Sequence, residues 1–89
     1  MSYELQAISR RCVTSIPANI AEGSGRKSGK EFTRFLHIAL GSATELETFL
    51  IIAQRLNYID NTTFENLNIS ITEIIRMTVG LIKSINKTN

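Results

Sequence analysis

The stretch SIPANIAEGSGRKSGKEFTRFLHIALGSATELE, residues 15–47, decides the fold of this 89-residue chain. It contains the only proline, a turn rich in glycine and basic residues, and the start of a long amphipathic segment. Apolar residues recur at three- and four-residue steps on both sides of the turn, which is the spacing of amphipathic helices. The stretch therefore predicts two helices joined by a short basic turn, residues 23–30, which we call the elbow.

The first helix is predicted over residues 3–22. Its apolar stripe consists of Leu5, Ile8, Cys12, Ile16 and Ile20. Pro17 removes one backbone hydrogen bond and costs about 3 kcal/mol inside a helix. Because the stripe keeps its phase across Pro17, we expect a kinked helix rather than a break. Gly23 is expected to end the helix in the left-handed conformation.

The second helix is predicted over residues 29–56. Ser28 is a good N-cap, and Glu31 stands three residues later, as in a capping box. Small residues gather in the middle of this helix around Gly41 and Ser42. A helical glycine costs roughly 1 kcal/mol relative to alanine, so Gly41 predicts a close contact with a neighbouring helix.

The third helix is predicted over residues 61–86, after a left-handed Asn57 and an N-cap at Asp60. Its stripe consists of Phe64, Leu67, Ile71, Ile74, Thr78, Leu81 and Ile85. The chain is thus predicted to be all-α, a single domain over residues 1–89. We expect an up-down antiparallel bundle of the four-helix-bundle type, with three helices present.

Some apolar residues fall outside these stripes. They are Ile38, Leu40, Ile51, Ile52, Ile69 and Met77. A monomer of three helices has few places to bury them, so they predict contact with another helix or another subunit.

Composition narrows the setting. A lone cysteine, Cys12, excludes an intrachain disulfide. The N-terminus lacks the apolar core of a signal peptide, and no segment has the roughly 20 uninterrupted apolar residues of a membrane span. We therefore expect a soluble, cytoplasmic protein that does not associate with membranes.

Catalytic and metal sites are not predicted. Cys12 and His37 are the only residues of their kinds; a dyad between them is conceivable, but Cys12 belongs to an apolar stripe. No glutamate has a histidine three residues later, so the di-iron bundle motif is absent. The elbow lacks the order of a phosphate loop, because Glu31 follows Gly29-Lys30. We expect no cofactor and no enzymatic activity.

Basic residues are unevenly distributed although the formal net charge is only +2. Six of the ten fall within one 25-residue window: Arg10, Arg11, Arg26, Lys27, Lys30 and Arg34. They are candidates for contacts with nucleic-acid phosphates, and the alternative is an ordinary solvated basic face. No aromatic residue is placed among them as a stacking platform, so backbone binding is favoured over sequence readout.

The motif residues resemble a known family. Ser15 to Gly23, the Arg26-Lys27-Ser28 turn, the Glu31 to Ser42 segment and the Glu45-Leu46-Glu47 run are similar to bacterial four-helix-bundle proteins, also described as 23S rRNA intervening-sequence proteins. A related branch is the accessory protein of diversity-generating retroelements. The polar motif positions are Asn19, Glu22, Ser42, Glu45 and Glu47, which we interpret as specifying packing and register. Glu45 is available to pair with an arginine of the first helix or of a neighbouring subunit.

The resemblance implies an up-down four-helix bundle that assembles into a ring-shaped homopentamer. The proteins of the related branch bind nucleic acid and a reverse transcriptase, which implies that nucleic acid is a candidate partner. It also implies a further N-terminal helix that residues 1–6 do not supply. Two functions are open: an oligomeric protein that binds RNA or DNA through the elbow, or a structural module that binds a protein partner and no nucleic acid.

Overall fold

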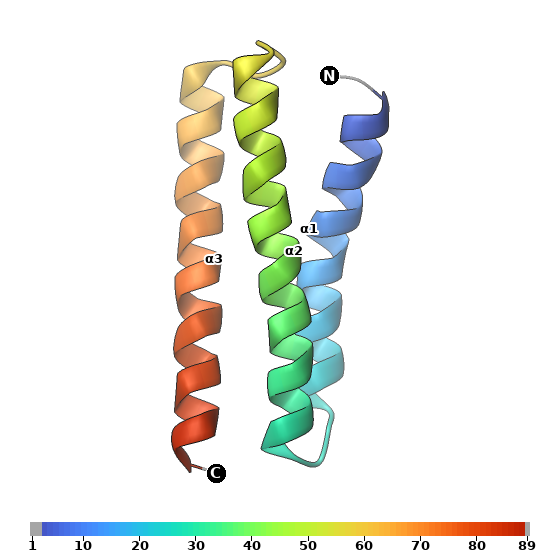
Figure 1. The fold of residues 1–89 in the computed structure, drawn as a ribbon, viewed down its shortest axis with the longest axis vertical. Coiled ribbons are helices and arrows are strands. Elements are labelled where there is room, and N and C mark those ends of the chain that lie inside the picture. Colours follow the sequence, from blue (N-terminus) through green and yellow to red (C-terminus); the bar gives the residue numbers. More distant parts are fainter. Residues whose placement is uncertain (1–2, 89) are drawn as a thin grey trace.

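The computed structural model describes residues 3–88, leaving aside the side chains of Leu5 and Thr88, and consists of three antiparallel helices. They are α1 (Tyr3–Ser24), α2 (Gly29–Arg55) and α3 (Asn61–Thr88). Helix α2 lies in the middle, with α1 on one side and α3 on the other (Figure 1). The predicted all-α bundle of three helices is confirmed.

Helix α1 runs through Pro17 without a break, as the phase of its apolar stripe predicts. The Thr14 hydroxyl, in the turn before the proline, donates to the carbonyl oxygens of Arg10 and Arg11 at 3.0 and 3.1 Å. Cys12 and Ile16 are buried against α2, and Ile8 and Ile20 pack against the same core. The apolar stripe therefore continues past the proline.

Gly23 does not have the role that the sequence predicts. No glycine among residues 3–88 has a positive φ, and α1 continues to Ser24, so the expected left-handed cap at Gly23 is wrong. The reason for glycine is steric: a Cβ atom there would lie 2.7 Å from Phe35 Cβ and 2.9 Å from Phe32 Cδ1. Gly23 thus lets the end of α1 approach the start of α2.

The other helix ends follow local capping chemistry. Ser28 Oγ accepts the Glu31 N–H at 3.2 Å, the first half of the predicted capping box. Asn57 has a φ of 61°, as predicted. The Tyr58 N–H donates to the Ala53 carbonyl and the Asn57 N–H to Gln54, which together form a Schellman motif.

The core lies along α2. Its buried residues are Phe35, Leu36, Ala39, Ala43, Leu46, Leu50 and Ala53. Three alanines stand among the larger residues of this row, which lets α1 and α3 both pack closely against α2. By length and composition α2 could cross a membrane. One such helix is weak evidence for a membrane span, because the core helix of a soluble protein passes the same test.

Helices α1 and α3 pack on α2 but not on each other. Between them runs an apolar groove, with α2 as its floor, in two sections of about 380 and 250 Å³. We define the apolar groove by Val13, Ile20, Leu46, Leu50, Leu67 and Ile74.

The surplus apolar residues are largely exposed, as the sequence suggests. Ile38, Ile51, Ile52, Ile69 and Met77 all lie on the surface. Gly41, however, lacks the predicted packing contact, because a Cβ atom built there meets nothing within 4 Å. The prediction for Gly41 is therefore wrong for the single chain.

The two helical glycines should respond in opposite ways to alanine. Gly23→Ala places a methyl group against Phe35, so we expect a loss of about 1–3 kcal/mol in the free energy of unfolding. Gly41→Ala meets open space and should gain about 0.5–1 kcal/mol from helix propensity. Urea titrations followed by circular dichroism measure both. A stabilising Gly23→Ala would contradict the close approach of α1 and α2.

Asp60 makes stability depend on pH in a defined direction. Its Oδ1 atom accepts the Thr63 N–H at 2.7 Å. That backbone hydrogen bond, with a contribution from the Thr63 side chain, lowers the pKa of the carboxyl below its ordinary 3.8. The ionised cap therefore stabilises the fold fully above pH 3.8, and this contribution is lost as the pH falls through the lowered pKa.

Asp60→Asn keeps an N-cap acceptor that does not titrate. We expect the melting temperature of the unmodified protein to fall more between pH 6 and pH 3 than that of Asp60→Asn. All other carboxyl groups are shared, so the difference isolates Asp60. Equal losses in the two proteins would show that the cap does not titrate with folding.

Candidate nucleic-acid interface

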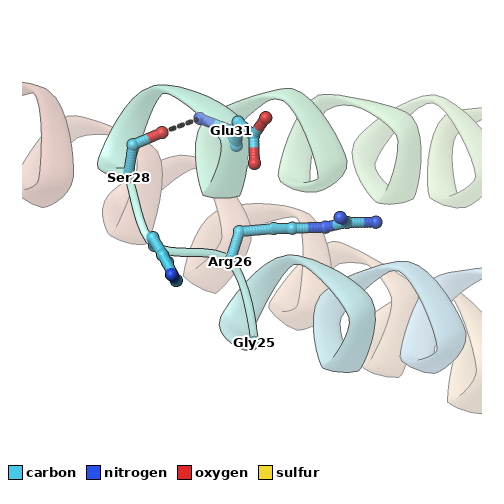
Figure 2. A pocket seen from close by; sticks show the side chains of 5 residues that line it. Gly25, Arg26, Ser28 and Glu31 are labelled. Carbon is cyan, nitrogen blue, oxygen red and sulfur yellow. Dashed lines mark hydrogen bonds between the residues drawn. The ribbon is translucent and has the colours of Figure 1, made fainter.

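Four basic residues lie in the elbow and the first turns of α2: Arg26, Lys27, Lys30 and Arg34. Two shallow depressions of about 500 and 700 Å³ lie among them and share Ser28 and Glu31 as lining residues. Figure 2 shows the first, with the Ser28–Glu31 hydrogen bond at the start of α2. The structure thus brings these four bases to one end of the bundle.

Two of the four are positioned by an aromatic ring. The guanidinium carbon of Arg34 lies 4.5 Å from the centroid of the Phe35 ring, and that of Arg26 lies 4.9 Å from it. Arg26 also forms an ion pair with Glu22, one turn back on α1. Phe35 is buried, so it orders the two arginines and does not offer a face to a base.

The remaining two bases are freer. Lys27 and Lys30 are exposed, and no ion pair holds either of them within residues 3–88. Ser28 satisfies the Glu31 amide, while the amides of Gly29 and Lys30 stand in the first turn, where a helix has no acceptor of its own. The helix N-terminus adds partial positive charge at the same place.

Two further basic residues, Lys83 and Lys87, lie near the elbow in the folded chain although they are distant from it in the sequence. The last turns of α3 lie at the same end of the bundle as the elbow (Figure 1), and Thr33 Oγ1 approaches Asn86 Oδ1 at 3.5 Å. Lys83 and Lys87 therefore belong to this end. They lie there because α3 runs antiparallel to α2. The helix pattern predicts this direction, but no local motif in the sequence marks the two lysines.

Arg10 and Arg11 do not join this group. They lie in the middle of α1, some 14 residues or about 20 Å of helix before Ser24. Arg11 faces Glu45 of α2 at 3.8 Å, an ion pair between the first two helices, which is one of the two partners that the sequence leaves open for Glu45. Both partners are largely exposed, so the pair adds orientation more than stability.

The polar motif residues hold the α1–α2 register. The hydroxyls of Ser15 and Ser42 lie 2.9 Å apart across the two helices. Asn19 Nδ2 donates to the Ser15 carbonyl at 2.8 Å and to its hydroxyl at 3.0 Å. The half-buried Ser15–Ser42 pair favours one alignment of the helices, because a slip would part the two hydroxyls, and Asn19 holds the Ser15 hydroxyl from within α1.

No catalytic arrangement forms around the cysteine and histidine. Cys12 is buried in the core cluster while His37 is exposed on α2. Burial, with a smaller contribution from Glu45, raises the pKa of the Cys12 thiol. Within residues 3–88, no group of His, Cys, Asp and Glu side chains could hold a metal ion.

Comparison with known families adds the decisive observation. The chain matches the description "23S rRNA-intervening sequence protein" over residues 1–80. It belongs to the 23S rRNA-intervening sequence protein family. The all-helical fold agrees with that family.

A solved structure is similar over most of this chain. It is a protein with unknown function from the S23 ribosomal protein family of Bacteroides thetaiotaomicron, 34% identical, with a TM-score of 0.90. The match covers 92% of this chain and 76% of that chain. A search of curated proteins found no match.

The buried thiol yields a prediction. Because the pKa of Cys12 is raised, little thiolate forms at pH 7, and the thiol is also sterically covered. We expect a disulfide reagent such as DTNB to label the folded protein at least ~100-fold more slowly than the protein unfolded in guanidinium. Labelling at the unfolded rate would contradict a core position for Cys12.

Proposed function

We propose that this member of the 23S rRNA-intervening sequence family is a non-enzymatic, cytoplasmic, oligomeric helical protein. It binds RNA or DNA through the phosphate backbone. The observation that carries the proposal is the gathering of Arg26, Lys27, Lys30 and Arg34 at the start of α2. Lys83 and Lys87 extend the same end of the bundle.

Local charge supports phosphate binding over a neutral partner. Within residues 22–34 four bases oppose two acids, and the ion pair with Arg26 offsets Glu22. Amides at a helix N-terminus and flanking cations are complementary to phosphate oxygens. Within residues 22–35 the two aromatic rings, Phe32 and Phe35, are half-buried and buried, so the complex is expected to be indifferent to sequence.

Self-association strengthens such a site. A single elbow offers few phosphate contacts and therefore weak affinity. Several elbows in one oligomer engage a strand together, and the effective concentration of the second contact raises the overall affinity. Proposing an oligomer is consistent with the exposed apolar residues of α2 and α3.

The second candidate function is a protein-interaction module that never binds nucleic acid. The apolar groove favours it, since continuous apolar surface on a soluble chain is typical of a protein interface. A complex with a protein bound in the apolar groove would gain most of its binding free energy from apolar burial. We therefore expect added salt to weaken such a complex little.

Replacing the two free lysines tests the nucleic-acid proposal. We expect Lys27→Glu with Lys30→Glu to weaken binding to a labelled 20-nucleotide RNA or DNA at least ~10-fold at ~50 mM salt, because two phosphate contacts become repulsive. The slope of log K against log salt should fall in magnitude by about 1.4–1.8. Fluorescence anisotropy over a salt series measures both.

Arg10→Glu with Arg55→Glu is the matched control, since it changes the net charge equally at exposed sites away from the elbow. Circular dichroism checks that helix content is retained in each variant. Equal weakening by the control would show that binding follows net charge and not the elbow. If the unmodified protein binds neither nucleic acid at low salt, the proposal is wrong.

A further inference from the structure

Glu31 places a carboxylate among the bases of the elbow. It lines the first shallow depression together with Arg26 and Lys27. It also lines the second depression, together with Lys30 and Arg34. A surface that bound phosphate oxygens alone would gain nothing from a negative charge between its bases, because like charges repel. A ligand complementary to the whole surface therefore combines phosphates with a group that donates a hydrogen bond.

The carboxylate of Glu31 is available to such a ligand. The Glu31 side chain is exposed, and within residues 3–88 it takes part in no ion pair and no hydrogen bond. Only the backbone N–H of Glu31 is bonded to Ser28, and the carboxylate is turned away from that residue (Figure 2). The two arginines of this end lie over the Phe35 ring, and neither forms an ion pair with Glu31. Both carboxylate oxygens can therefore accept hydrogen bonds from outside the chain.

Ribose supplies the donor that deoxyribose lacks. Each nucleotide of RNA carries a 2′-hydroxyl group close to its phosphate, and this group is what lets a protein tell RNA from DNA. Carboxylates serve as acceptors for ribose hydroxyls in dinucleotide-binding folds. A hydrogen bond to an ionised acceptor is also stronger than one between neutral groups. A carboxylate flanked by bases is thus complementary to a ribose flanked by phosphates.

We propose that the elbow prefers RNA to DNA, and that Glu31 makes the distinction by accepting a hydrogen bond from a 2′-hydroxyl group. The inference rests on the proposed function, since the bases of the elbow first have to hold the phosphate backbone. Lys27 and Lys30 contact the phosphates on either side of the ribose. In a DNA complex the same carboxylate meets phosphates without a donor between them, so it lowers the affinity.

Three labelled oligoadenylates of about 20 nucleotides test the proposal, because they carry the same bases on ribose, deoxyribose and 2′-O-methyl ribose. Fluorescence anisotropy at ~50 mM salt should show the RNA bound at least ~5-fold more tightly than either of the others. Glu31→Ala removes the acceptor together with a negative charge. It should therefore strengthen DNA binding and bring the RNA-to-DNA affinity ratio within ~2-fold of unity.

Glu22→Ala is the matched control, because Glu22 is the other acid of residues 22–34 and pairs with Arg26. It removes the same charge and should leave the affinity ratio unchanged. The Ser28 cap bonds the backbone of residue 31, so Glu31→Ala should retain its helix content by circular dichroism. Equal binding of the three oligonucleotides, or an RNA preference that survives Glu31→Ala, would overturn this inference and leave the proposed function standing. Loss of the preference in Glu22→Ala would do the same, whereas binding of none of them would overturn both.

Discussion

The close contact between α1 and α2 is the constraint on which the rest of the structure depends. It is fixed at three heights: Gly23 against Phe35, Ser15 against Ser42, and Arg11 against Glu45. At Gly23 only a residue without a side chain fits against Phe35. The Ser15–Ser42 hydroxyl pair forms in one register of the two helices, and the Arg11–Glu45 ion pair forms in the same register. Burial of Cys12 and Ile16 along the same seam supplies the apolar stabilisation.

That contact positions both candidate surfaces. With Gly23 close to Phe35, the elbow folds tightly, and Arg26 and Arg34 reach the same ring. The bases are therefore gathered at one end rather than spread along a loose turn. Since α1 occupies one side of α2 and α3 another, the apolar groove remains between them. One basic end and one apolar groove thus follow from a single packing arrangement.

Much of the fold is predictable from the sequence because its signals are local. Heptad-like stripes predict three helices, and Ser28, Asn57 and Asp60 mark their ends through hydrogen bonds within a few residues. The errors concern glycines, whose roles depend on distant neighbours. Gly23 serves a contact with Phe35 rather than a left-handed turn, and Gly41 meets open space in the single chain. Lys83 and Lys87 join the basic end only through the tertiary return of α3, which no local motif marks.

A nuclear Overhauser spectrum of the folded protein tests the central contact most directly. A Cβ atom on Gly23 would lie 2.7 Å from Phe35 Cβ, so the hydrogens of the two residues must be close in space. We predict strong cross-peaks from the Gly23 α-hydrogens to the Phe35 β-hydrogens. Their absence from a spectrum that shows all three helices folded would contradict the account.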